Sequence, residues 1–343
     1  MTCNCQIVPD DVLERLAKDA SFTEEQRRNF ANTAAVSRAF RKLRVDVSEF
    51  TASTTDRFLA AGAGPPAPSV TVADCHHTQT LPGTPIAHPD TAADGTVKRA
   101  FVEAAAVAAF YSAAFGRNSI DDAGMTIASS VHYGNKYNNA FWNGMRMAYG
   151  DGDGDIFIDF TLGNDVIGHE LTHGVTQHSL QLAYADEAGG LNESISDAFG
   201  SMFRQWQANQ TVDLADWLIG KDIIGPGGTA RGYTCLRDMA SPGAAHCLAP
   251  QPYTYADYKP GMDPHYSSGI PNLAFCNVAK AIGGKSWEKA GRIWYKALTG
   301  FGPDSTLGMK AFADRTRQVA ASIFPGDAGV AHAVDAGWVS VGL

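Results

Sequence analysis

Five consecutive residues carry the clearest chemistry in this sequence. In His169-Glu170-Leu171-Thr172-His173 the two histidines are four residues apart, and on a helix such positions share one face, so both imidazoles can bind one ion. A catalytic zinc ion takes three protein ligands and keeps a fourth position for water. Glu170 lies beside the first histidine and can accept a proton from that water. The pattern predicts a zinc site in which Glu170 is the general base.

A second motif, GGLNESISDAFG at 189–200, is expected to supply the third ligand. Glu193 and Asp197 are four residues apart, so on a helix they also share a face. Glu193 can bind the metal, and Asp197 can hold the outer N–H of a ligating histidine and fix its orientation. Glu193 on its own would be assigned to a solvated helix face, but the neighbouring histidine motif favours a ligand.

The overall composition narrows the function classes. The 343 residues are 45% hydrophobic and 18% charged, which is typical of a globular protein with a substantial core. The net charge of −9 argues against a nucleic-acid partner, and no apolar run is long enough to predict a membrane span. The N-terminus lacks the features of a secretory signal, so we expect cytoplasmic synthesis and, if the protein is secreted, a non-classical route. We expect a monomer.

The chain divides at a segment rich in glycine, proline and alanine. Residues 60–69 (AAGAGPPAPS) carry no charge and have the composition of an exposed linker. We therefore expect a short N-terminal segment at 1–50, a linker at 51–69, a β-rich lobe at 70–164 and an α-helical lobe at 165–343.

Apolar periodicity predicts the main elements. Helices are expected over 10–19, 23–43, 96–115, 165–179, 191–208, 271–282, 285–298 and 305–324, and strands around 125–133 and 144–149. Between Glu25 and Asp46 all six charged residues are basic. This stretch could dock on the acidic remainder by attraction or present a solvated helix face.

Several stretches resemble the thermolysin family of zinc metallopeptidases. They are SSVHYGNKYNNAFWNGMRMAYGDGDG (129–154), GNDVIGHELTHGVTQHS, GGLNESISDAFG, ADWLIGKDI, LRDMASP, HYSSGIPN and AVDAGWVSVGL. The N-terminal CNCQIVPDDVLERLAKD resembles the short propeptide of the protealysin-like branch. The resemblance implies an α+β, two-lobed thermolysin-like fold with an active-site helix between the lobes. It also implies a zymogen of a neutral endopeptidase with one catalytic Zn²⁺, which cuts before bulky hydrophobic residues.

The resemblance assigns further residues to substrate binding and catalysis. Tyr184 and His265 would stabilise the oxyanion of the tetrahedral intermediate. Asn139 and the Ala140 backbone would bind the substrate main chain as an added strand, and Arg237 would hold a substrate carbonyl. The apolar pocket for the residue after the cut would be formed by Phe157, Phe160, Val166, Ile223 and Leu236. An ordinary role in the core is equally open for these five.

Two departures from the family pattern affect the expected site. Family members bind a pair of calcium ions, but Arg204, Leu218 and Lys221 occupy positions where glutamates are expected, and cations there would repel calcium. We expect Arg204 and Lys221 to pair with Asp165 and Asp216 instead.

The second departure concerns the support of His265. The family often has an aspartate five residues before this histidine, and here that residue is Pro260. We expect Asp263 to orient His265 in its place.

Two explanations of latency follow from the N-terminus. A thiolate of Cys3 or Cys5 could occupy the water position on zinc, or the apolar residues 7–9 could block the cleft as a poor substrate. The propeptide would then be the intramolecular inhibitor of the enzyme, removed by self-processing within 45–69.

Two further functions and one disulfide are compatible with the sequence alone. The chain could be a catalytically silent binding protein that keeps the peptidase fold, or a peptidase that trims only free N-termini. Cys235 and Cys247 could pair across a loop, although six cysteines without a secretory signal do not establish a disulfide framework.

Overall fold

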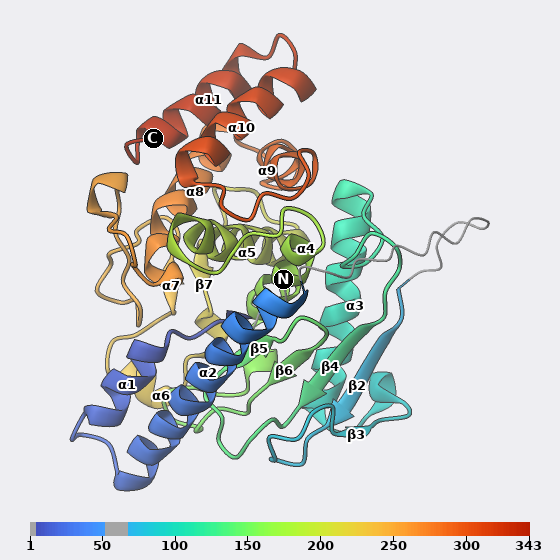
Figure 1. The fold of residues 1–343 in the computed structure, drawn as a ribbon, viewed down its shortest axis with the longest axis vertical. Coiled ribbons are helices and arrows are strands. Elements are labelled where there is room, and N and C mark those ends of the chain that lie inside the picture. Colours follow the sequence, from blue (N-terminus) through green and yellow to red (C-terminus); the bar gives the residue numbers. More distant parts are fainter. Residues whose placement is uncertain (1–4, 52–67) are drawn as a thin grey trace.

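The computed structural model describes the backbone of residues 5–51 and 68–343, and the side chains of 5–39 and 68–343. A mixed sheet forms the lobe drawn in the lower half of Figure 1, and helices α8 to α11 form the lobe drawn at the top. Helices α4 (Asn164–Gln177) and α5 (Asp186–Gln207) lie between the two. The α+β, two-lobed arrangement predicted from the sequence is confirmed.

The sheet has six strands, and its order differs from their order along the chain. From one edge to the other it runs β1 (Cys5–Gln6), β5 (Ala140–Trp142), β6 (Met147–Tyr149), β4 (Ile127–Val131), β2 (Val70–Asp74) and β3 (Thr84–Pro85). Strand β4 pairs in parallel with β2 and β6, and the other pairs are antiparallel. The first strand of the chain therefore extends the sheet beyond β5.

Helix α3 (Gly95–Phe115) packs against β2 and β4 and against the active-site helix α4. The side chain of Asp94 accepts hydrogen bonds from the N–H groups of Thr96 and Val97, which caps the start of the helix. Gly116 has φ of 71° and ends the helix, because this left-handed conformation suits glycine. These signals explain why the predicted helix at 96–115 is confirmed almost to the residue.

The helical lobe is built from α8 (Gly269–Ile282), α9 (Ala290–Thr299), α10 (Met309–Ile323) and α11 (Ala328–Val339). The indoles of Trp294 and Trp338 stack at 5.8 Å in its core. The predicted start of α9 at residue 285 was wrong, because Gly283 and Gly284 have positive φ and a turn follows them. Helix α11 was not predicted from the sequence.

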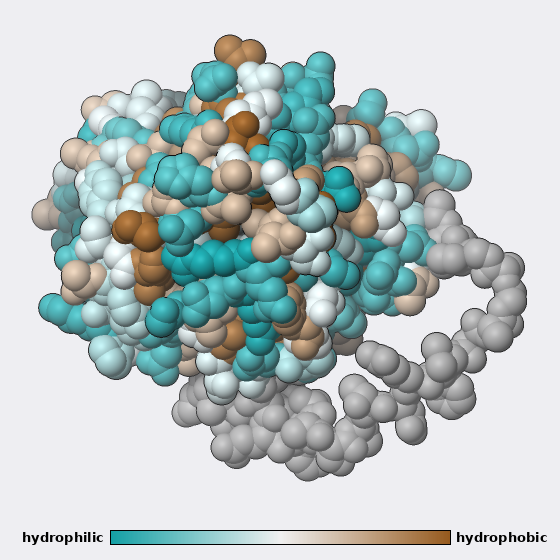
Figure 2. Space-filling view, turned by 90° about the horizontal axis from the view of Figure 1, so that it is seen from above, coloured by the Kyte–Doolittle hydropathy of each residue, from teal (hydrophilic) through white to brown (hydrophobic). Residues whose placement is uncertain are grey.

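Shorter elements connect these parts. They are α6 (Pro226–Ala230), α7 (Pro264–Ser267), β7 (Leu218–Ile219), β8 (Arg237–Asp238), and the single turns Pro89–Thr91, Phe160–Leu162, Lys221–Ile223 and Tyr255–Asp257. In the described part of the chain, no helix is both long and apolar enough to cross a membrane. On the face shown in Figure 2, hydrophilic and hydrophobic residues are interspersed.

The N-terminal segment forms two packed helices, α1 (Asp10–Lys18) and α2 (Glu24–Thr51). Apolar residues of α1 are buried, namely Val12, Leu13 and Leu16. The described part of the basic stretch gives no support for docking by its positive charges. Arg38 pairs with Glu14 inside the N-terminal segment. An ion pair that joins the segment to the rest of the protein has the opposite polarity, because Glu25 of the segment pairs with Lys136 at 2.7 Å.

His132, a partly buried residue directly after β4, links the sheet to the start of α3 and makes the free energy of unfolding depend on pH. His132 Nδ1 lies 2.9 Å from Asp151 and its Nε2 lies 3.1 Å from Asp94, while His77 contacts the other oxygen of Asp151 at 3.1 Å. The hydrogen bond with Asp151, opposed by burial, raises the pKa of His132 to about 9. A raised folded-state pKa stabilises the protein fully below the unfolded value near 6.5, and this stabilisation is lost as pH rises through 9.

We therefore expect His132→Gln to cost about 1–2 kcal/mol of unfolding free energy at pH 6, after allowance for solvent screening. The cost should fall toward zero near pH 9.5, because the wild-type imidazole is then mostly neutral in both the folded and the unfolded state, like the glutamine that replaces it. Urea unfolding of the two proteins across this pH range measures the difference. A cost that does not change with pH would contradict a protonated His132.

Candidate active site

Helices α4 and α5 bring the two sequence motifs together because small residues line their contact. A Cβ built on Gly168 would lie 3.0 Å from the Cα of Gly200, and one on Gly200 would lie 2.5 Å from the carbonyl oxygen of Asp165. A larger residue at either position would push the helices apart. The glycines therefore fix the distance between the histidines of α4 and the carboxylates of α5.

The three predicted metal ligands converge on one point. The Nε2 atoms of His169 and His173 lie 3.0 Å apart, and the carboxylate of Glu193 lies 3.4 Å from each of them. All three side chains are fully buried. Glu193 Oε2 has no hydrogen-bond partner among the described residues, which is costly unless a metal occupies the point. Two imidazoles and one carboxylate are a catalytic zinc set, so these residues fit a zinc ion.

A second layer of side chains orients both histidines. His169 Nδ1 lies 2.8 Å from Asp197 Oδ1, as expected from the spacing of the second motif. His173 Nδ1 lies 2.9 Å from Asn192 Oδ1 and 3.0 Å from Ser196 Oγ. With both Nδ1 atoms engaged, each Nε2 is directed at the metal position.

Asp197 is itself held by a buried arginine. Arg237 donates to both carboxylate oxygens, at 2.8 and 2.7 Å, and Asn272 donates to Oδ2 at 2.8 Å. Burial would raise the pKa of Asp197, but Arg237 and His169 outweigh it and lower the pKa to about 2. Asp197 therefore remains an anion at neutral pH and keeps accepting from His169.

Glu170 has one anchored and one available oxygen. Its Oε2 accepts a hydrogen bond from the backbone N–H of Trp142 at 2.9 Å, and its Oε1 has no hydrogen-bond partner among the described residues. Burial raises the pKa of Glu170 well above its usual range, against an opposing effect of His169. An oriented carboxylate with a raised pKa is suited to accepting a proton in a reaction near neutral pH.

Tyr184 and His265 lie together beside the carboxylate of Glu193. The Tyr184 hydroxyl donates to Glu193 Oε1 and lies 3.1 Å from His265 Nε2. His265 Nδ1 lies 2.7 Å from Asp263 Oδ1, so Asp263 occupies the orienting position expected for it from the sequence. His265 Nε2 lies 2.6 Å from the backbone carbonyl oxygen of Gln6.

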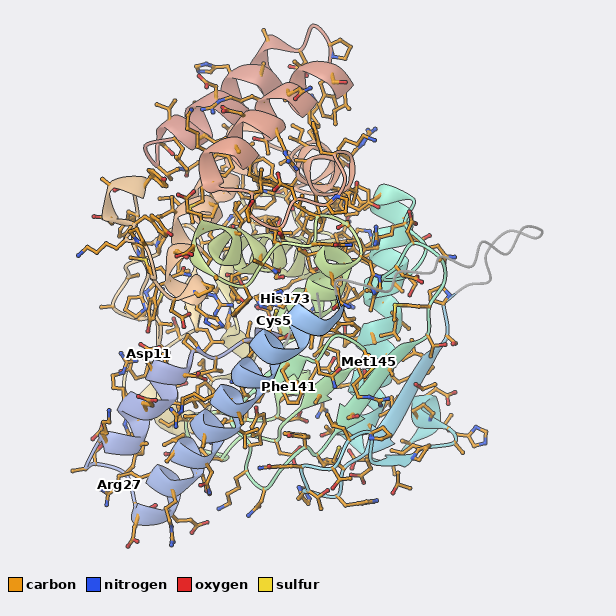
Figure 3. All side chains as sticks on the ribbon, in the orientation of Figure 1. Cys5, Asp11, Arg27, Phe141, Met145 and His173 are labelled. Carbon is orange, nitrogen blue, oxygen red and sulfur yellow. The ribbon has the colours of Figure 1, made fainter. Side chains whose placement is uncertain are left out.

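The first described residues of the chain lie in this site as an added strand. Strand β1 pairs antiparallel with β5, with Cys5 opposite Trp142. Strand β1 also contacts α4, and Figure 3 labels Cys5 together with His173 on α4 and Phe141 on β5. The N-terminal segment thus follows the sheet edge directly beside the metal ligands.

The predicted main-chain binding groups all contact this segment. Ile7 donates its N–H to the carbonyl of Ala140 at 3.3 Å, and its own carbonyl accepts from Arg237 Nη1 at 2.9 Å. The side-chain amide of Asn139 makes two hydrogen bonds of 3.0 Å with the backbone N–H and carbonyl of Val8. These are the groups through which an extended substrate would be held.

The five residues predicted to form the apolar pocket are all fully buried. Ile7 belongs to the same contiguous apolar core as Phe157, Phe160, Val166, Ile223 and Leu236. Val166 and Ile223 both lie within 3.1 Å of the point where Gly163 would carry a Cβ, so these two side chains adjoin. Their role in selecting a substrate side chain stays a prediction.

The structure bears on only one of the two N-terminal cysteines. Cys5 is buried and disulfide-bonded, so in this form it offers no thiolate to a metal. Cys3 lies outside the described residues, as do the expected processing positions in the linker. The contacts of residues 6–8 instead match the second explanation, in which an apolar stretch blocks the cleft.

An ion-pair network forms where the family would bind calcium and where this chain was expected to lack the acidic ligands. Arg204 lies 3.6 Å from Asp165, 3.6 Å from Asp216 and 3.2 Å from Asp222, and Lys221 lies 3.1 Å from Asp216. The predicted pairing of Arg204 and Lys221 with Asp165 and Asp216 is present. Asp165 is fully buried in the first turn of α4, so this network anchors the start of the helix that carries His169 and His173.

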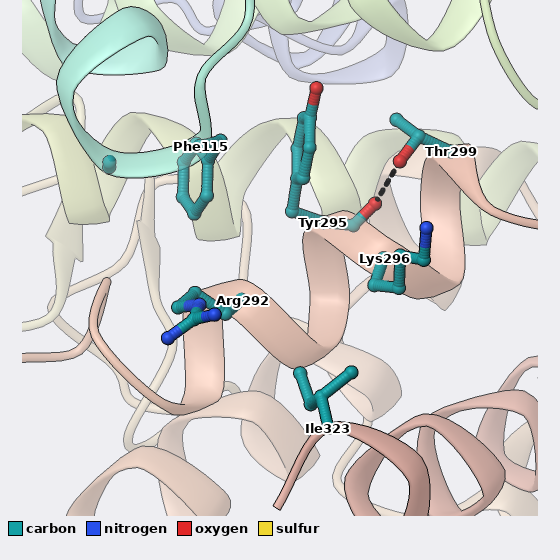
Figure 4. Close-up of a pocket in the computed structure, with 7 residues that line it drawn as sticks. Phe115, Arg292, Tyr295, Lys296, Thr299 and Ile323 are labelled. Carbon is teal, nitrogen blue, oxygen red and sulfur yellow. Dashed lines mark hydrogen bonds between the residues drawn. The ribbon is translucent and has the colours of Figure 1, made fainter.

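A hollow of about 450 Å³ lies elsewhere, between the end of α3 and helices α9 and α10 of the helical lobe. Figure 4 shows Phe115, Arg292, Tyr295 and Ile323 around it, with Thr299 donating to the Tyr295 carbonyl at 2.8 Å. None of the residues that line it belongs to the metal site. The hollow is therefore separate from the edge of β5 along which β1 lies.

Sequence reasoning assigned no role to three residues that hold the site. Asn192 and Ser196 orient His173, and Asn272 supports Asp197. Asn192 and Ser196 lie within the second motif, one residue before Glu193 and three after it, so their helical faces offered a signal. Asn272 is distant along the chain, and only the packing of α8 against α5 reveals it.

Comparisons with known proteins agree with this geometry. Residues 33–177 match the family described as thermolysin metallopeptidase, catalytic domain, and residues 180–343 match its alpha-helical domain. The solved precursor of protealysin, a metalloproteinase from Serratia proteamaculans, superposes with a TM-score of 0.83 at 34% identity, over 98% of this chain and 99% of that one.

Curated relatives point the same way. An extracellular metalloprotease of Pectobacterium carotovorum is 38% identical over 99% of this chain and 96% of its own length. Protease PrtS of Photorhabdus is 39% identical over 79% of this chain and 75% of its own length. Thermolysin of Alicyclobacillus acidocaldarius is 40% identical over 55% of this chain and 35% of its own length.

Proposed function

Because the chain belongs to the thermolysin family of metallopeptidases and is a metalloendopeptidase, we propose that it is made as a zymogen and cuts before bulky hydrophobic residues. The observation that carries this proposal is the position of residues 6–8. The carbonyl of Gln6 meets His265, and Ile7 follows it in contact with Ala140 and Arg237. The Gln6–Ile7 peptide bond thus occupies the place of the bond to be cut, with a bulky apolar residue after it.

The chemistry follows from the groups around that bond. Zinc, when bound by His169, His173 and Glu193, supplies a Lewis acid and lowers the pKa of a bound water to about 7. Glu170 takes a proton from the attacking water and passes it to the leaving nitrogen. The donors on Tyr184 and His265 stabilise the negative charge that develops on the substrate oxygen.

Binding of the substrate main chain selects extended peptides. Asn139, Ala140 and Arg237 hold four successive backbone groups, the N–H and carbonyl of Ile7 and of Val8, so any sequence in a strand conformation can dock. The side chain after the cut enters the apolar core around Phe160 and Leu236, which favours Leu, Ile, Val or Phe there. This arrangement needs no free terminus and favours an endopeptidase over an aminopeptidase.

The same contacts make the N-terminal segment an inhibitor in this proposal. Residues 6–8 engage Asn139, Ala140, Arg237 and His265, so a substrate that needs these groups cannot bind while α1 and α2 hold the segment in place. Activation then requires that the segment be cut from the enzyme and leave the cleft.

A substitution inside the segment tests the proposal. The purified full-length Ile7→Glu protein should cleave an internally quenched peptide, blocked at both ends, at least tenfold faster than full-length wild type, because a charged side chain cannot remain in the apolar core. Lys18→Glu is the matched control, since Lys18 is exposed and, among the described residues, pairs with Glu14 alone. The masses of the products should place the cut before Leu or Phe. Equal initial rates for the two variants would sink the inhibitory role, and cuts confined to free N-termini would sink the endopeptidase assignment.

A catalytically silent binding protein is the competing function. It would need at least one catalytic group displaced, whereas the metal ligands, Glu170, Tyr184 and His265 all converge here. The absence of any cleavage by a zinc-loaded protein freed of residues 1–50 would favour a binding protein.

A further inference from the structure

A second group of metal-binding side chains lies behind the substrate-binding arginine. Cys235 and Cys247 are both thiols, so the disulfide considered from the sequence is not formed. Their sulfur atoms lie 3.8 Å apart, and a ring nitrogen of His246 lies within 4.8 Å of both sulfur atoms. We propose that Cys235, Cys247 and His246 form a second zinc site, separate from the catalytic one.

The spacing of the sulfurs suits a shared tetrahedral ion. Two thiolates at about 2.3 Å from one zinc ion, with a tetrahedral angle between them, are about 3.8 Å apart. A disulfide would instead require about 2.0 Å. Two thiolates and an imidazole select zinc and other thiophilic cations over calcium or magnesium, which prefer oxygen ligands.

The backbone holds the ligands in register without help from an ion. Thr234 donates its N–H to the carbonyl of His246 at 3.0 Å, and Leu248 donates to the carbonyl of Cys235 at 3.0 Å. These two bonds flank a parallel bridge between Cys235 and Cys247. The two sulfurs therefore face each other on rigid, paired segments, so an ion binding there has little conformational entropy to overcome.

The histidine is supported as metal-binding histidines are. Its Nε2 lies 3.2 Å from Asp238 Oδ2, and Asp238 Oδ1 accepts from the N–H groups of Ala240 and Ser241 at 2.8 and 3.0 Å. A carboxylate fixed in this way can orient the imidazole so that its other nitrogen meets the ion. Cys235 and Cys247 are buried, whereas the His246 side chain is 39% exposed, so it provides the entry path.

A second group of potential metal ligands, His77, His132 and Asp151, is less well suited to binding an ion. His132 already directs one ring nitrogen at Asp151 and the other at Asp94. Neither nitrogen is left for an ion unless those contacts break. The cysteine group is therefore the stronger candidate among the described residues.

The position of the site gives it a role. Strand β8 starts two residues after Cys235 and carries Arg237, which holds both Asp197 and the carbonyl of Ile7. An ion that ties Cys235 to Cys247 fixes the start of this strand against the following loop. The site would thus stabilise the arginine that binds substrate, without contacting substrate itself.

Metal content measured without catalysis tests the proposal. The full chain would carry His173→Ala, which removes a catalytic ligand, together with Cys3→Ser and Cys5→Ser, so that the N-terminal thiols cannot contribute. The reduced, metal-free protein is titrated with Co²⁺ and then with Zn²⁺. We expect one tight equivalent, with a thiolate-to-cobalt charge-transfer band that zinc abolishes.

Variants at the site separate the outcomes. Adding Cys235→Ser and Cys247→Ser should remove the band, Cys276→Ser should leave it unchanged, and His246→Ala should keep a band while weakening affinity at least tenfold. If the double serine variant does not fold, the result for His246→Ala decides, because that side chain is partly exposed. The proposal is overturned by absence of the band, by its survival in the double serine variant, or by a Cys235–Cys247 disulfide in freshly isolated protein.

Discussion

A Glu170→Gln variant is expected to bind zinc as wild type does and to lose about 10³–10⁴-fold in kcat/KM. Glutamine keeps the shape of Glu170, and its amide oxygen can still accept the hydrogen bond from Trp142. It cannot accept a proton from water, so the attacking group is no longer generated efficiently. The same loss should leave the variant at full length, because a protein that cannot cut peptides cannot process itself.

Three measurements check this prediction. They are zinc content, the rate of cleavage of a blocked peptide after residues 1–50 have been removed, and the mass of the intact chain over time. Glu103→Gln in α3 is the control, because Glu103 contacts Gln207 and no residue of the metal site. More than about a tenth of wild-type activity in the Glu170→Gln protein would exclude Glu170 as the general base.

An Arg204→Met variant is expected to lose about 3 kcal/mol of unfolding free energy at pH 8, the cost of leaving a buried charge without its partner. Asp165 is fully buried and, within the described part of the chain, would keep only its hydrogen bonds with the N–H groups of Gly220 and Val166. Burial already raises the pKa of Asp165, against the opposing effect of Arg204. Without Arg204 the pKa rises further, so the penalty should shrink as pH falls toward 5 and Asp165 takes up a proton.

The neighbouring lysine provides the control for Arg204. Lys221→Met removes a pair with the partly exposed Asp216 and should cost less than 1 kcal/mol. Chemical unfolding at pH 5 and pH 8 distinguishes the two. Millimolar calcium should leave the stability of wild type unchanged, because Arg204 occupies the space between the acids. A strong calcium-dependent rise in stability would refute that assignment.

The catalytic centre could be predicted from the sequence because helical geometry is local. His169 and His173 are one helical turn apart, and Glu193 and Asp197 repeat the same spacing, so the face of each helix was fixed by counting residues. The distance between the two helices could not be obtained by counting residues. It depends on the Gly168–Gly200 contact, which no periodicity shows.

Features that depend on contacts between residues far apart in the chain were harder to predict from the sequence. Strand β1 has two residues and lies beside β5, more than 130 residues later in the chain, so no local pattern marks it as a strand. Asn272 and the Cys235–Cys247 approach are likewise set by tertiary packing. Helix α11 was missed because alanine, glycine and valine recur in it without a polar face to give a period.

The pairing of β1 with the edge of β5 has a consequence for which proteins this enzyme can digest. Once that edge is vacated, it accepts only a chain whose own backbone hydrogen bonds have been given up. Helices and paired strands in a folded target cannot enter, so the target must first open locally. The rate of digestion would then follow the free energy of that opening rather than the number of hydrophobic residues in the target. Loose loops, frayed termini and damaged proteins would be consumed while intact domains survive.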